Sequence, residues 1–273
     1  MKKKTSNIRW IALLIKYSVI LLISYGLISY FLLPQFWKKI EKRQHYIHSI
    51  WQTFTAEGFS GDPINLIFIT SQNDLIDTFL QEGWRASDPI RLKSIFKMGK
   101  TLIEEKPYPS APISPLFWQG RKEDFAFEKE VYQTFQKRHH IRFWRTDLGE
   151  GEWTMWLAAA TFDQGFRFSE YTGQLLHRIS PDIDRERSYV LQSMIDNKNF
   201  RFLMKIGGKG EMEQAKNGEG DLYFTDGQID VLVLSTRGKA SAFSPQDLSL
   251  LSPSWKIDHQ FWRFFNHLFT SFL

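Results

Sequence analysis

The residues from Trp10 to Leu33 form an almost wholly apolar run in which Lys16 is the only charge. At about 1.5 Å of rise per residue, such a run makes roughly 36 Å of helix, enough to cross a hydrocarbon core about 30 Å thick. Bulky residues end the run and no small-residue cleavage site follows, so an uncleaved signal anchor is predicted rather than a signal peptide or a buried core helix. We expect a single-pass membrane protein with residues 1–9 as a basic cytoplasmic tail and residues 10–33 as the span.

The membrane side of the remaining chain is weakly determined, because basic residues flank both ends of the span. Lys16 can snorkel toward the amino-terminal interface, which favours an amino end in the cytoplasm of a bacterium and a body outside its inner membrane. The net charge of +5 lies largely beside the span, where anionic lipids attract it. The lipid bilayer is therefore the expected partner, and we expect no nucleic acid, since no basic recognition surface is present.

The segments on either side of the body are predicted to be helical. Residues 34–60 are interpreted as a helical stalk, with a helix continuing from Gln35 to Glu57. Residues 236–273 are interpreted as a linker and an aromatic amphipathic helix, since Asp258 to Leu273 repeats apolar residues at the helical spacing. Whether this last helix packs on the domain or lies on lipid stays open.

The body, residues 61–235, alternates between helical and strand-like patterns. Ser71 and Asp74 give a capping signal for a helix over 72–81. Tight turns are predicted at Asp163-Gln164-Gly165 and at Asp226-Gly227, and a glycine-rich loop is predicted over 207–220. Strands are predicted over 64–70, 116–119, 125–129, 139–146, 153–162, 166–169, 175–179, 201–206, 222–225 and 228–234, and further helices over 92–105 and 181–197. The fold class is α+β, a mainly antiparallel sheet with helices on one face.

Several segments carry a family resemblance. They are Gly61-Asp62-Pro63-Ile64-Asn65, Gly83-Trp84-Arg85, Tyr108 to Leu116, Arg138 to Arg145, Ala159 to Asp163, His177 to Arg187 and Tyr223 to Gly227. In this order they resemble the LssY C-terminal domain family over about residues 61–235. The resemblance implies no particular reaction. Relatives often carry a membrane portion similar to lipid phosphatases, but its motifs are missing here, so that activity is not carried over.

The candidate site follows from strand register. A hairpin closed by residues 147–152 places His139 and His140 opposite about 159–161, beside Asp163. Adjacent histidines in a strand point to opposite faces, so one of the two is expected to join Asp163. Counting one strand for each predicted turn puts His177 three strands away, at about 14 Å, and so outside that cluster.

The residues assigned to the site are His139, His140 and Asp163 as catalytic candidates and Arg142, Trp144, His177 and Arg187 as substrate-binding candidates, with no metal ligand and no cofactor assigned. Asp182 and Asp184 are explained by capping of the helix that follows them. Two functions stay open. The first is an accessory or interaction domain of the bacterial envelope that holds a protein or lipid partner. The second is a metal-assisted phosphoester or lipid-headgroup hydrolase, so enzymatic activity is not decided.

Overall fold

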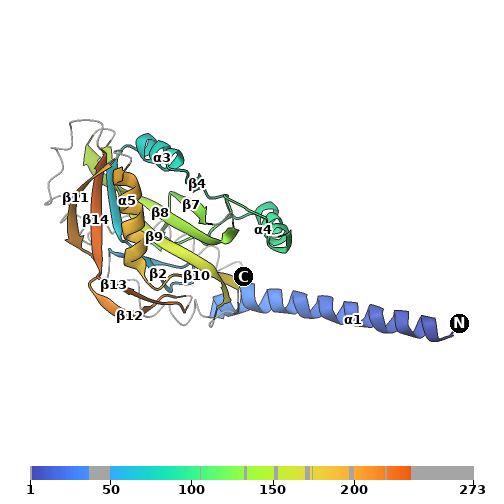
Figure 1. Ribbon diagram of the computed structural model, residues 1–273. Coiled ribbons are helices and arrows are strands. Elements are labelled where there is room, and N and C mark those ends of the chain that lie inside the picture. Colours follow the sequence, from blue (N-terminus) through green and yellow to red (C-terminus); the bar gives the residue numbers. More distant parts are fainter. Residues whose placement is uncertain are drawn as a thin grey trace.

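The computed structural model describes residues 2–36, 50–104, 106–131, 134–150, 153–169, 173, 175–196, 200–218 and 220–234. The predicted aromatic helix over 258–273 therefore lies outside the described residues. Figure 1 shows a single long helix projecting from a layered body.

The projecting helix begins as α1, Lys2–Leu27, widens into a π-helical turn over Ile28–Leu32, and returns to α-helix up to Phe36. The wide turn lies just before Pro34, a residue that cannot donate a backbone hydrogen bond. Leu13–Phe36 is long and apolar enough to cross a membrane, and it is the one such helix among the described residues. The structure thus supports the predicted membrane-spanning helix.

The body is built on one large sheet with the strand order β11-β14-β3-β9-β8-β7-β4, to which β10 adds by pairing with β9. Its strands are β3 Leu66–Thr70, β4 Arg85–Ala86, β7 Phe125–Val131, β8 Thr134–Glu150, β9 Trp153–Phe168, β10 Leu175–Ile179, β11 Phe200–Gly207 and β14 Gln228–Leu234. All neighbours pair antiparallel except β14 and β3, which are parallel. The predicted mainly antiparallel α+β fold is confirmed.

Two layers cover the two faces of this sheet. On one face lie α3, Gln72–Gln81, and α5, Ile183–Asp196, which pack on an aromatic core that includes Phe68, Phe79 and Phe143. A small sheet with the order β2-β1-β5-β6 covers the other face. Its strands are β1 Gln52–Phe54, β2 Ser60–Pro63, β5 Phe117–Trp118 and β6 Arg121–Lys122. The alternation of side chains along β8 and β9 supplies both cores.

Three further elements complete the body, namely α4 Leu92–Glu104 and the strand pair β12 Met212–Lys216 and β13 Leu222–Thr225. The predicted cap of α3 is confirmed, since the Asp74 backbone N–H donates to the Ser71 hydroxyl at 3.1 Å.

Several local predictions are wrong. The helix from Gln35 to Glu57 does not extend to its predicted end, because residues 52–54 form β1. The loop over 207–220 contains β12, and Asp226-Gly227 does not close a hairpin, because β13 pairs with β12 while β14 pairs with β11 and β3. The Asp226 carboxylate binds Arg187 of α5 instead, and its backbone N–H donates to Asp184. These contacts of Asp226 hold the connection between β13 and β14 against α5.

The turn predicted at Asp163-Gln164-Gly165 is also wrong. The strand β9 continues through these residues without a turn. Gly165 has a φ of 148°, a backbone conformation that residues other than glycine rarely adopt. The next strand, β10, pairs directly with this extension, so Ile179 lies opposite Asp163 and His177 opposite Phe166.

Candidate functional site

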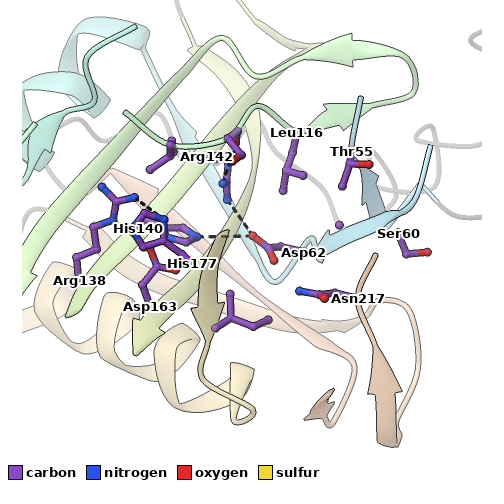
Figure 2. Close-up of a pocket in the computed structure, with 14 residues that line it drawn as sticks. Thr55, Ser60, Asp62, Leu116, Arg138, His140, Arg142, Asp163, His177 and Asn217 are labelled. Carbon is purple, nitrogen blue, oxygen red and sulfur yellow. Dashed lines mark hydrogen bonds and ion pairs between the residues drawn. The ribbon is translucent and has the colours of Figure 1, made fainter. Parts of the chain in front are cut away.

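A small cavity of about 30 Å³ lies between the end of the large sheet and the strand β2. Figure 2 shows Arg142, His140 and Asp62 turned toward one another, with Thr55, Ser60 and Asn217 beyond Asp62. The cavity is lined by Thr55, Ser60, Gly61, Asp62, Ile113, Ser114, Leu116, Arg138, His140, Arg142, Asp163, His177, Ile179 and Asn217. Its volume has room for a water molecule or a similarly small polar group.

Alternate residues of β8 form one wall of the cavity. Arg138, His140 and Arg142 alternate in the sequence, so their side chains share one face of the sheet. The β8–β9 register places Arg138 opposite Asp163 and His140 opposite Thr161. This agrees with the register predicted from the 147–152 turn and brings the basic residues of one strand beside the carboxylate of the next.

His140 is held between two carboxylates in the protein interior. Its Nδ1 lies 3.2 Å from Asp163 Oδ2, and its Nε2 lies 3.7 Å from Asp62 Oδ2 and contacts the Thr161 hydroxyl. Burial alone lowers the pKa of His140, but the charge of Asp163 outweighs it, and the pKa is raised above its ordinary value. The protonated imidazole is therefore the favoured form.

The two carboxylates are stabilised as anions. Burial alone raises the pKa of Asp62, but the hydrogen bond with His140 and the charge of Arg142, whose guanidinium donates at 2.8 Å, hold it below its usual range. The pKa of Asp163 also lies well below its usual range, because His140 and His177 outweigh the effect of burial. Both acids are thus ionised at neutral pH.

Arg138 joins the cavity to a second buried acid. Its guanidinium binds Asp163 at 3.0 Å, the backbone carbonyl of Ala111 at 3.1 Å and Glu128 at close range. Burial raises the pKa of Glu128 to about 8, against the lowering effect of Arg138, so at pH 7 this carboxyl is largely protonated.

His177 contributes a neutral imidazole to the cavity. Its Nδ1 lies 3.5 Å from an Arg138 nitrogen, and because a guanidinium only donates, Nδ1 accepts and the proton is assigned to Nε2. Burial lowers the pKa of His177 to about 4, so the ring is uncharged at neutral pH.

Five polar atoms of residues that line the cavity have no hydrogen-bond partner among the described residues. Three are donors, namely Arg142 Nε, His177 Nε2 and Thr55 Oγ1. The others are the acceptor Asp163 Oδ1 and His140 Nδ1, which lies 3.2 Å from Asp163 Oδ2. Buried polar atoms without partners are costly, so this cluster indicates a place for a polar group from outside the chain.

The remaining assigned residues lie elsewhere. His139 points to the opposite face, where its Nδ1 lies 2.8 Å from Glu186 and its ring stacks on Tyr189. Trp144 packs in the core between the large sheet and the small sheet, and its indole N–H donates to the Arg121 carbonyl at 3.1 Å. Arg187 lies in α5 and pairs with acids that include Asp226 and Asp230. Of the adjacent histidines, His140 is thus the one beside Asp163.

The expectation that His177 lies outside the cluster is wrong. It lines the same cavity as His140 and Asp163. The predicted distance assumed an extra strand between them, whereas β10 pairs directly with the continuous β9.

Sequence reasoning missed Asp62, Arg138, Thr55 and Asn217 as site residues. Two signals were present, since Asp62 belongs to a segment that carries the family resemblance and Arg138 continues the alternation of His140 and Arg142. Within the described ranges, no group of three or more His, Asp or Glu side chains is arranged to hold a metal ion. Arginine and histidine side chains instead surround the carboxylates of Asp62 and Asp163.

Comparison with known proteins places the chain in a family. A family model described as LssY C-terminus matches residues 40–229, which is more than half of the chain and includes most of the elements that build the cavity. No curated protein and no solved structure matches the chain. The family model covers the body almost throughout, behind a helix that is long and apolar enough to cross a membrane, and the chain is a member of the LssY C-terminus family.

Proposed function

We propose that this protein is a membrane-tethered binding domain whose cavity accepts the anionic oxygens of a phosphodiester, while the rest of the lipid headgroup stays outside the cavity. The observation that carries the proposal is the set of three unpartnered donors on the cavity wall, Arg142 Nε, His177 Nε2 and Thr55 Oγ1. A phosphodiester supplies acceptor oxygens and a single negative charge, and it needs no metal to be bound by arginine and histidine.

The charges around the cavity favour one negative group. Arg138, Arg142 and the protonated His140 set three positive charges against the two carboxylates Asp62 and Asp163, while Glu128 and His177 are neutral at pH 7. With Glu128 protonated, as its raised pKa favours, one positive charge is left over. A buried excess charge is expensive, and a bound monoanion cancels it.

The position of the cavity supports a lipid source for this group. The Tyr25 hydroxyl of the membrane-spanning helix donates to the Gly173 carbonyl at 2.7 Å, between β9 and β10. His177 lies in β10, a few residues beyond this contact. Figure 1 shows β10 and β2 at the end of the body where the projecting helix joins it. These contacts support a cavity on the side of the domain that adjoins the projecting helix.

Titration of the full chain in uncharged, phosphate-free maltoside micelles tests the proposal. Glycerophosphoglycerol is the ligand, inorganic phosphate and glycerol are compared with it, and calorimetry is the readout. The Thr55→Val variant loses one donor at almost constant shape and should bind about tenfold or more weakly, as expected for a hydrogen bond to a charged group.

Thr70→Val is the matched control, because Thr70 Oγ1 is another buried hydroxyl without a hydrogen-bond partner in the described chain. It lies opposite Thr154 on β9, nine residues or roughly 30 Å along the strand from Asp163. No binding by the unmodified chain, or equal affinities for the two variants, would refute the proposal. Equal binding of inorganic phosphate would show that a free oxyanion, rather than a lipid, is the source.

A second function is favoured by the proton chain at His140. The ring connects Asp163 on one side to the Thr161 hydroxyl and Asp62 on the other, which is the arrangement a general acid or base requires. A phosphodiester held beside it would be placed for hydrolysis. Release of glycerol phosphate from a phosphodiester by the full chain, abolished in His140→Gln, would support this function over binding alone.

A further inference from the structure

Among the described side chains of the helix α4, two small polar ones are buried and two large apolar ones are exposed. Its small polar residues Ser94 and Thr101 are buried, at 7% and 8% exposure, while Leu92 and Phe96 are 75% and 76% exposed. Ser94, Met98 and Thr101 follow the spacing of one helix face, and Leu92, Phe96 and Gly99 follow that of another. A soluble surface helix usually buries its large apolar residues, so Leu92 and Phe96 form an apolar patch on the outward side of α4.

The two hydroxyls that α4 buries have hydrogen-bond partners close by in the chain. The Ser94 hydroxyl donates to carbonyl oxygens of the preceding turn, and it accepts from the Arg91 N–H at 2.8 Å. The Thr101 hydroxyl donates to the Lys97 carbonyl at 2.7 Å. The two buried hydroxyls are therefore satisfied within the helix and the turn that precedes it, and neither needs a partner on the body.

Basic residues flank the apolar face. Arg91, Lys93, Lys97 and Lys100 are all exposed, and Glu104 is the one acid between Pro89 and the end of the helix, which gives this stretch a net charge of +3. Lys97 is also held over the Tyr108 ring at 3.7 Å and lies 3.9 Å from Asp88. Apolar side chains bordered by lysine are the pattern of a helix that lies in the interface of an anionic membrane.

Because the membrane-spanning helix joins the body on this side, the bilayer that it crosses lies near this side of the body. Figure 1 shows α4 at the end of the body from which α1 projects, level with the last part of that helix. The strand end that leads toward the Tyr25–Gly173 contact carries Phe168, which is 64% exposed. Two separate segments thus present large apolar side chains on the side where the span meets the body.

We propose that α4 is an interfacial helix, which rests its Leu92 and Phe96 face in the headgroup region of the same anionic bilayer that α1 crosses. Its lysines contact anionic headgroups, and its apolar face enters about 5–10 Å into the headgroup and acyl boundary. This contact fixes the rotation of the body about the span. It is independent of ligand binding in the cavity.

The chain contains no cysteine, so a single spin label reports one position without background. The full chain carrying Phe96→Cys is labelled and reconstituted in vesicles of phosphatidylcholine with about a third phosphatidylglycerol, in the range of anionic surfaces that attract basic segments. The matched control is Gln81→Cys, an exposed position at the end of α3, which Figure 1 shows farther from α1 than α4 is. Depth is measured from the accessibility of the label to oxygen and to a water-soluble nickel complex.

The label at position 96 should report about 5–10 Å of immersion and the label at 81 an aqueous environment. Adding Lys93→Glu and Lys100→Glu should make the label at 96 shallower, as should neutral vesicles. The Thr55→Val change should leave the depth unaltered, which separates this result from cavity binding. An aqueous signal at 96 in anionic vesicles would overturn the proposal and would point to a protein partner for this face.

Discussion

Replacing His177 with glutamine should change how the stability of the protein depends on pH between pH 6.5 and pH 4. Burial lowers the pKa of His177 from 6.5 to about 4, so the unfolded chain binds this proton more readily than the folded one. The stabilising contribution is therefore present above pH 6.5 and is lost as the pH falls through 4. The difference between the two pKa values, at about 1.36 kcal/mol per pH unit, corresponds to a loss of about 3 kcal/mol.

Other buried groups also make stability depend on pH, so the measurement has to compare the unmodified chain with the variant. The raised pKa of His140 makes its contribution complete below pH 6.5, and Asp62 and Asp163, whose pKa values are lowered, lose theirs only below about 3.8. Glu128 opposes His177, because its raised pKa of about 8 stabilises the fold below 4.5 and loses this effect as the pH rises through 8. The difference between the unmodified chain and the variant isolates His177.

The assay is urea unfolding of the full chain in maltoside micelles, followed by the fluorescence of the buried tryptophans Trp84, Trp144 and Trp156. Free energies of unfolding are measured for the unmodified chain and for His177→Gln at half-unit steps from pH 7 to pH 4. The stability of the variant relative to the unmodified chain should rise by about 3 kcal/mol over this range. A difference that stays constant within about 1 kcal/mol would show that the burial of His177 does not govern its protonation.

Four other outcomes are expected. Arg138→Met should lower the free energy of unfolding by about 3–5 kcal/mol, because it leaves buried carboxyl groups without their cation, and a loss below 1 kcal/mol would contradict the assigned pairing. Gly61→Ala should cost about 1–3 kcal/mol in the same assay, since its Cβ would lie 2.7 Å from Thr53 Oγ1. Ser71→Ala should cost about 1 kcal/mol through loss of the α3 cap, and an unchanged stability would refute that role. The chain should stay with the membrane pellet after carbonate extraction, and release of intact protein would exclude a spanning helix.

The parts of this structure that the sequence predicts are those that depend on neighbouring residues. Ser71 and Asp74 form the α3 cap within one turn, and the β8–β9 register follows from the short connection over 147–152. The length of the apolar run near the amino end decides the membrane-spanning helix without reference to the rest of the chain. These interactions close within a few residues, so composition and spacing are sufficient.

The parts that escaped prediction depend on partners distant in the chain. Asp62 reaches the cavity because β2 packs over the large sheet, where it meets Arg142, which is 80 residues away. The parallel pairing of β14 with β3 leaves β13 to pair with β12, so a strong turn dipeptide at Asp226 does not make a hairpin. Gly165 resembles a turn glycine, yet it serves an extended strand. No local pattern distinguishes these uses.

In the lipid-binding function proposed above, the contact between Tyr25 and Gly173 sets the headgroup concentration that the cavity meets. Because the body touches the spanning helix directly, the cavity does not diffuse away from the bilayer, and lipid headgroups are present to it at a high effective concentration. A dissociation constant near 1 mM, about −4.1 kcal/mol, then suffices for occupancy. For such a site, discrimination between headgroups matters more than high affinity, because the bilayer supplies the ligand in excess.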